Sequence, residues 1–238
     1  FKQKTAYEML RSLVGSEMCI RDSVSSVVFS QNTYWYDVLL EVKAENTENV
    51  ASLVDGYYSS INIPENVGVA FSSIPLKGTS ENATHIISIV ADSSKALADF
   101  RNSLSGSAWD LYLLKMQKNI ENVRASAGKG LLSFNSELEQ PIGQAWVFNV
   151  KDANNFVQAF GKLMKTYKVD GLVEVGQIVH GTDNGENMYI YGTYEDLSQA
   201  FDFGPKNDKE SKAFSLFNQE ISKENYLKSF TRVLIKKF

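Results

Sequence analysis

Apolar and polar residues alternate along several short stretches of the chain, and the first of these covers residues 36–42. Large apolar or aromatic side chains occupy its even positions, while Asp37, Leu39 and Glu41 occupy the odd ones. A period of two is typical of a strand with one face in a core. From Val50 to Tyr58 apolar residues recur every three or four positions instead, which predicts an amphipathic helix.

The same two periods predict the remaining elements. After the first helix we expect strands over 67–76 and 84–90, a second helical region beginning at Asp92 or Ser93, and a strand within 123–134. In the second half we expect a strand over 145–150, a helix over about 152–167, strands over 172–180 and 187–193, helical segments separated near Gly204-Pro205, and a strand over 230–237.

The two halves of the chain share a pattern of residues at nearly constant spacing. The matched segments are 78–100 with 181–203 at an offset of 103, 108–112 with 213–217 at 105, and 42–43 with 150–151 at 108. Small loop insertions between equivalent elements would produce such drifting offsets. Trp109 and Phe214 take the same place in this alignment, and we expect both to anchor the core of their helical regions.

Each half follows the order strand, helix, two strands, helix, strand, which is that of the ferredoxin-like unit. Over residues 34–238 the tandem pair resembles the dimeric α+β barrel superfamily, which includes antibiotic-biosynthesis-monooxygenase-like and chlorite-dismutase-like proteins. The resemblance implies an α+β fold in which two βαββαβ ferredoxin-like repeats, 31–134 and 144–238, pack as a pseudo-dimeric barrel around the linker 135–143. The duplication has a physical reason, because two helices cover only one face of a four-stranded sheet.

The first thirty residues are expected to lie outside this domain. Residues 1–23 resemble translated adapter read-through at the ends of open reading frames in assembled metagenomes. Residues 24–30 are small and apolar and end in VFS before Gln31, which resembles the tail of a secretory signal peptide from exported bacterial proteins. We therefore expect a periplasmic or secreted protein, although an edge strand or an unstructured leader is the alternative for 24–30.

Composition and charge remove several classes of function. With 24 Lys and Arg against 28 Asp and Glu in 238 residues, and no basic cluster, nucleic acid is an unfavourable partner. Two His and one Cys are too few for a Cys-rich or His-rich metal centre, so no metal site is predicted. No apolar run reaches the roughly 18 residues of a membrane span. The chain is expected to act as a monomeric pseudo-dimer or a homodimer.

The face of each sheet turned away from its helices is the more polar one and is the predicted place of a ligand. Our candidate ligand-binding residues there are Asp37, Glu41, Asn149, Tyr189 and Tyr191, with Arg124 or Arg232 added from the last strands. Plainer interpretations stay open, since Asp37 and Glu41 can be solvated carboxylates and tyrosine is common in strands.

The two histidines differ as candidate functional residues. His180 ends a strand beside a turn and is the sixth candidate, as a general base or an axial haem ligand. His85 falls on the helix-facing side and is expected to pack. Nucleophile-elbow, P-loop and zinc motifs are missing from the sequence, so catalytic residues stay unassigned. No cofactor is predicted, and haem is implied only by the resemblance.

Two functions from different classes remain open. The first is a non-catalytic exported protein that binds a small apolar or aromatic molecule between its sheets, or that serves as a structural module, and this is favoured by the missing motifs. The alternative is a monooxygenase-like or haem-binding enzyme of the dimeric α+β barrel superfamily. Whether the chain is an enzyme cannot be decided from fold resemblance alone.

The assignment of the N-terminal segment generates the first prediction. A chain that begins at Gln31 should melt within about 2 °C of the full chain, because residues 1–30 contribute nothing to the core. Thermal unfolding of the two chains side by side tests this. A drop of more than about 8 °C, equivalent to about 2 kcal/mol or more at this length, would contradict it.

Overall fold

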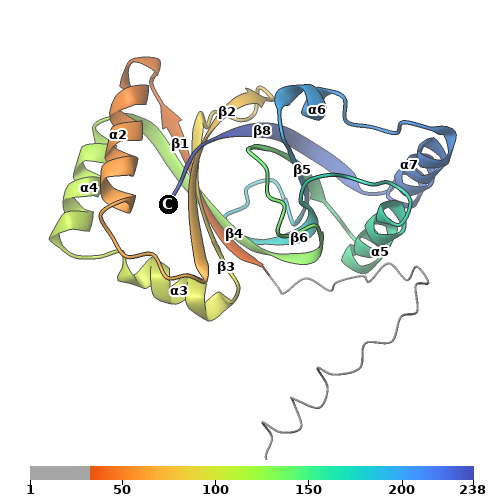
Figure 1. Ribbon diagram of the computed structural model, residues 1–238, viewed down its shortest axis with the longest axis horizontal. Coiled ribbons are helices and arrows are strands. Elements are labelled where there is room, and N and C mark those ends of the chain that lie inside the picture. The colour runs from red at the N-terminus through yellow and green to blue at the C-terminus, as the bar shows by residue number, and fades with distance from the viewer. Residues whose placement is uncertain (1–32) are drawn as a thin grey trace, which may run out of the picture.

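The computed structural model describes residues 33–238, in which eight antiparallel strands close into a barrel (Figure 1). The segments interpreted above as adapter read-through, 1–23, and signal-peptide remnant, 24–30, lie outside the described residues. Around the barrel the order is β1-β3-β2-β8-β5-β7-β6-β4. The strands are β1 (Tyr34–Val42), β2 (Val67–Lys77), β3 (His85–Ala91), β4 (Ile120–Phe134), β5 (Ile142–Asn149), β6 (Val173–His180), β7 (Met188–Tyr194) and β8 (Asn225–Lys237).

Strand pairing is the same in both halves of the chain. In the first half β1 lies between β3 and β4, and β2 pairs with β3. In the second half β5 lies between β7 and β8, and β6 pairs with β7. The halves join where β4 pairs with β6 and β2 pairs with β8. These two seams satisfy both outer strands of each half and leave no open sheet edge.

Helices cover the outside of the barrel on two opposite sides. The elements of the first half (η1, α2, α3 and α4) lie on one side, and α5 and α7 of the second half lie on the other (Figure 1). The second helical region of each half is broken in two, at Gly106, which has a φ of 85°, and near Gly204-Pro205. The bounds are η1 (Ala44–Asn46), α2 (Thr47–Tyr58), α3 (Ser94–Ser103), α4 (Ser107–Gln117), α5 (Ala153–Met164), α6 (Leu197–Phe201) and α7 (Asp208–Glu220).

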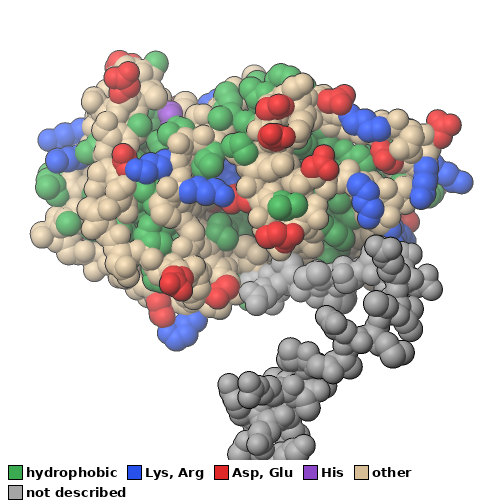
Figure 2. Space-filling view, viewed as in Figure 1, with side chains coloured by type: hydrophobic (Ala, Val, Ile, Leu, Met, Phe, Trp, Pro, Cys, Tyr) green, Lys and Arg blue, Asp and Glu red, His purple; other side chains and the backbone are tan. Residues whose placement is uncertain are grey.

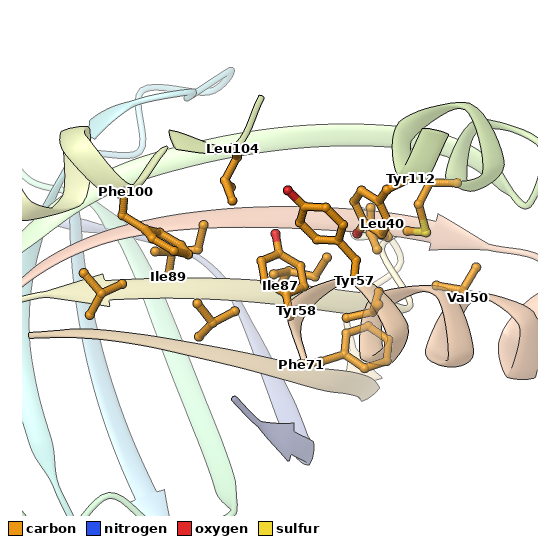
Figure 3. Close-up of a cluster of buried hydrophobic side chains, with 14 of the residues drawn as sticks. Leu40, Val50, Tyr57, Tyr58, Phe71, Ile87, Ile89, Phe100, Leu104 and Tyr112 are labelled. Atoms are coloured by element: carbon orange, nitrogen blue, oxygen red, sulfur yellow. The ribbon is translucent and has the colours of Figure 1, made fainter. Parts of the chain in front are cut away.

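Each side has its own hydrophobic core between helices and sheet. In the first half Leu40 and Val42 of β1 meet α2 and α4, as the alternating pattern predicts (Figure 3). In the second half Phe148 and Val150 meet α5 and α7. The C-terminal Phe238 crosses to the first core, where its ring lies 5.5 Å from that of Tyr58. The apolar face of each sheet therefore serves the helices, and the other face is turned into the barrel.

The predicted helix anchors need a correction. Trp109 and Phe214 are only half-buried and lie at the rim of their cores. The buried aromatics are the next ones along each helix, Tyr112 and Phe217, one helical turn further on, with 6% and 8% of their surface exposed. The repeated pattern predicts the correct helix face, but the second aromatic of each pattern is the one that enters the core.

The surface carries mixed charge. On the face seen in Figure 2, acidic and basic side chains are interspersed with apolar ones and form no extended patch of one sign. No helix within residues 33–238 is both long enough and apolar enough to cross a membrane.

Burial of the second aromatic generates a stability prediction. Phe217→Ala should lower the free energy of unfolding by about 3–5 kcal/mol, because a buried ring is removed from a packed core. Trp109→Ala and Phe214→Ala should each cost less than this, since part of each ring stays exposed to water. Chemical denaturation measures all three changes.

The matched control is Leu216→Ala, because Leu216 precedes Phe217 on α7 and is 50% exposed. It should change the free energy of unfolding by less than about 1 kcal/mol. Equal losses for Leu216→Ala and Phe217→Ala would show that the face of α7 turned to the core is assigned wrongly.

Candidate functional site

A cavity of about 1010 Å³ occupies the inside of the barrel. All eight strands contribute inward-facing side chains to its wall. The volume lies at the upper end of the range typical of small-molecule sites. A completely packed interface between the sheets, the alternative to a ligand site, is not what the structure shows. The apolar part of the wall includes Trp35, Leu39, Ile86, Val147, Ile178 and Phe230.

Asp37 faces this cavity from the middle of β1. It lies opposite Ser88 of β3, whose hydroxyl hydrogen-bonds to the carboxylate. Burial raises the pKa of Asp37 above its ordinary value, while the Arg232 guanidinium and the Ser88 hydroxyl partly offset that rise. The result is a half-buried carboxyl group without a salt bridge to any described residue, next to space that a ligand could fill.

Arg232 of β8 holds the polar side of the cavity in place. Its Nε donates to the Tyr191 hydroxyl at 2.8 Å, and its Nη1 donates to Ser88 at 3.0 Å. Nη2 forms a salt bridge to Glu139 at 2.8 Å and also donates to Tyr191. Burial raises the pKa of the Tyr191 hydroxyl to about 12, so this group is neutral at pH 7. The guanidinium thus fixes three neighbours and has little capacity left for a ligand.

A second carboxyl group, that of the buried Glu174 on β6, lies in the same wall. It accepts hydrogen bonds from the Tyr189 hydroxyl at 2.5 Å and from the Ser133 hydroxyl at 2.7 Å. The Tyr189 oxygen in turn accepts one from Trp35 Nε1 at 2.9 Å. Burial raises the pKa of Glu174 and, together with the Glu174 charge, that of Tyr189. This chain of hydrogen bonds fixes the rings of Tyr189 and Trp35 against the wall.

Glycines in neighbouring strands make room for these large side chains. A Cβ on Gly176 would lie 2.3 Å from the Tyr189 ring and hydroxyl, and a Cβ on Gly143 would lie 2.2 Å from the Tyr191 hydroxyl. The tyrosines can therefore lie along the wall instead of filling the cavity. The Gly128-Lys129-Gly130 triplet has the same use, since Gly128 lies against Trp35 and Gly130 against Glu174.

Ion pairs gather at one end of the barrel, where the β2–β3 and β6–β7 loops lie. Buried Glu81 forms salt bridges with Arg124 and, at 3.4 Å, with Lys228. Lys228 also lies 3.8 Å from Glu186, which accepts hydrogen bonds from the backbone of Asn184 and Asp183. At the opposite end the linker between β4 and β5 brings Glu139 to Arg232 and, at 2.9 Å, to Lys237.

The structure brings only some of the predicted site residues together. Asp37, Tyr189 and Tyr191 line the cavity, as do Arg124 and Arg232. Glu41 lies beyond the end of the cavity beside a separate space of about 30 Å³, although it shares the strand face of Asp37. Asn149 packs its amide against Gly185 of the β6–β7 loop. His180 is exposed at the end of β6 and is not part of the cavity wall.

Neither histidine of the chain offers a ligand to a haem iron inside the barrel. His85 is buried on the helix-facing side, where its ring stacks on Phe71 at 5.4 Å and burial lowers its pKa. His180 points to solvent instead. A histidine-ligated haem does not fit this wall. Residues 33–238 also contain no group of three or more His, Cys, Asp or Glu side chains placed to hold a metal ion.

Sequence reasoning missed seven of the eight carboxyl groups in the cavity wall, among them Glu174, Glu81 and Glu139. A signal existed for Glu174, because a charged residue stands between Val173 and Val175 in a strand. Glu81 and Glu139 lie in connecting segments, where periodicity gives no direction to a side chain.

Comparison with known proteins gives the fold. No protein-family model and no curated protein matches the sequence. Among solved structures, a proposed monooxygenase from Lactobacillus acidophilus has a TM-score of 0.59 at 16% identity, over 87% of this chain and 95% of that one. A proposed monooxygenase from Fusobacterium nucleatum has a TM-score of 0.58 at 14% identity, over 88% of this chain and 95% of that one. An anthrone oxidase-like protein has a TM-score of 0.58 at 10% identity, over 88% of this chain and 93% of that one. These likenesses show that the chain shares its fold, a closed antiparallel barrel with helices on the outside, with these proteins.

Proposed function

We propose that the barrel cavity binds one small, largely apolar aromatic molecule and that the chain oxidises it as a monooxygenase-like enzyme. The observation that carries this proposal is the half-buried Asp37 carboxyl group, with its raised pKa, in the wall of a cavity of about 1010 Å³. The aromatic rings and aliphatic side chains of the wall, Trp35 and Phe230 among them, would hold the body of such a molecule.

Asp37 is the group proposed to do chemistry, as a general base. A raised pKa brings a carboxylate closer to the operating pH, which makes it a better proton acceptor. The Asp37 carboxylate would take a proton from an acidic C–H or O–H of the ligand and become a carboxylic acid. The resulting ligand anion is electron-rich and can reduce molecular oxygen, the co-reactant.

For an active methylene the overall reaction balances without a bound cofactor. One oxygen atom of O₂ enters the ligand as a ketone, and the other leaves as water with the two methylene hydrogens. The names of the similar structures, monooxygenase and anthrone oxidase-like, belong to this class of reaction. At such low identity they support it only by analogy, so the chemistry rests on the cavity.

Anthrone and Asp37→Asn provide the decisive test. The wild type should bind anthrone, with quenching of Trp35 fluorescence, and should consume oxygen faster than anthrone does alone. Asp37→Asn should keep binding within about threefold and lower the rate by about 10²–10⁴-fold, because only the base is lost.

Glu41→Gln is the matched control, since Glu41 shares the strand face of Asp37 but lies outside the cavity. Its rate should equal that of the wild type. Binding without oxygen consumption in the wild type would favour the non-catalytic binding protein instead. Full activity in Asp37→Asn would show that Asp37 is not the base.

The Ser88–Asp37 hydrogen bond generates a pH prediction. The hydroxyl stabilises the ionised carboxylate and so lowers its pKa. Ser88→Ala removes that stabilisation, so the pKa of Asp37 rises and a higher pH is needed to ionise it. The rising limb of the pH–rate profile should therefore move to higher pH than in the wild type. A limb that stays in place or moves to lower pH would contradict the assignment.

We also infer that the two halves are copies of one βαββαβ ferredoxin-like unit. The identical strand pairing supports this, as does the placement of Arg124 and Lys228. Arg124 lies opposite Leu39 of β1, Lys228 lies opposite Val147 of β5, and each forms a salt bridge with a loop glutamate. A residue-by-residue superposition of 34–134 on 142–237 tests it, and it requires Leu39 and Val147 to coincide.

A further inference from the structure

The charges in the cavity wall are unequal in number. Among residues 33–238, four cationic side chains line the cavity, namely Arg124, Lys228, Arg232 and Lys237, against eight carboxyl groups. All four cations lie within salt-bridge distance of a glutamate: Arg124 and Lys228 at Glu81, and Arg232 and Lys237 at Glu139. Each positive charge that a ligand could meet in this wall is therefore already neutralised.

Arg232 would otherwise be the natural receptor for a ligand carboxylate, since it lies in the cavity beside aromatic side chains. Its donors already reach Tyr191, Ser88 and Glu139. Its side chain is only 14% exposed. A carboxylate that entered would have to displace Glu139, and it would also face the Asp37 and Glu174 carboxyl groups in the same wall.

We propose that the cavity selects its ligand by charge, admitting uncharged aromatic molecules and excluding organic anions, and that Glu139 is the residue that determines this specificity. Glu139 lies at the mouth of the barrel on the β4–β5 linker, and its two carboxylate oxygens take one cation each: Oε1 pairs with Arg232 and Oε2 with Lys237. Burying an anion without a counter-charge is costly, because water is removed and nothing replaces it. This inference rests on the proposed binding function.

Three probes of similar size and different charge test the selection. They are 2-naphthylmethanol, which is neutral, 2-naphthoate, which is an anion, and 2-naphthylmethylammonium, which is a cation. Titration calorimetry at pH 7 with the wild type should give a dissociation constant for the alcohol at least about tenfold lower than for the naphthoate. The ammonium probe should bind no more weakly than the alcohol, since the uncompensated carboxyl groups attract it.

Glu139→Gln tests the role of the residue itself. It removes the negative charge that pairs with Arg232 and Lys237, so the dissociation constant of naphthoate should be at least about tenfold lower than for the wild type. The dissociation constant of the alcohol should change by less than about threefold, which also shows that the cavity is intact. Glu137→Gln is the matched control, because Glu137 is exposed on the same linker and is not part of the cavity wall. It should leave both constants unchanged.

The outcomes separate this inference from the proposed function. If the wild type binds none of the three probes, both are wrong. If the alcohol binds but naphthoate binds equally well, only the selection by charge is wrong. Equal gains in Glu137→Gln and Glu139→Gln would overturn the role of Glu139 in favour of a general charge effect. Should melting show that Glu139→Gln is unfolded, the ranking of the three probes on the wild type still decides whether anions are excluded.

Discussion

Backbone hydrogen bonding across two seams, β4 with β6 and β2 with β8, is the constraint on which the rest of this structure depends. A four-stranded sheet with helices on one face has two unpaired edges and one uncovered face. Joining two such sheets edge to edge satisfies both edges at once, and the uncovered faces then enclose a common interior. The cavity thus follows from closure, and it stays open because the large inward-facing side chains, Tyr189 and Tyr191 among them, lie along the wall.

Closure also explains why the polar groups of the interior come from both halves. Trp35 reaches Tyr189, Ser88 reaches Arg232, and Glu81 reaches Lys228, over 154, 144 and 147 residues of sequence. Such contacts stabilise the protein only when both sheets are folded, because an unpaired charge in the interior costs free energy. The two helix-covered cores come mainly from one half each, with Phe238 crossing to the first and Phe134 to the second, whereas the interior is built from both halves throughout.

The alternating pattern was sufficient to predict which face of each strand turns inward, and Asp37, Tyr189 and Tyr191 were found by it. It could not show where along a strand the cavity ends, so Glu41 and Asn149 were included although they lie outside its wall. Nor could it place Glu81 and Glu139, whose directions are set by connecting segments. The repeated Ala-aromatic pattern predicts the buried helix face, but the depth of each ring depends on how the helix packs on the sheet, which no periodicity contains.

The glycines beneath the tyrosines determine how the size of the cavity can change. Gly143 and Gly176 do not line the cavity, yet they decide how far the Tyr191 and Tyr189 rings lie from the barrel axis. A methyl group at either position would push the neighbouring tyrosine ring inward and make the cavity smaller on that side only. Substitutions at the glycines behind the cavity wall can therefore change the range of molecules that fit, while every residue with a chemical role is retained.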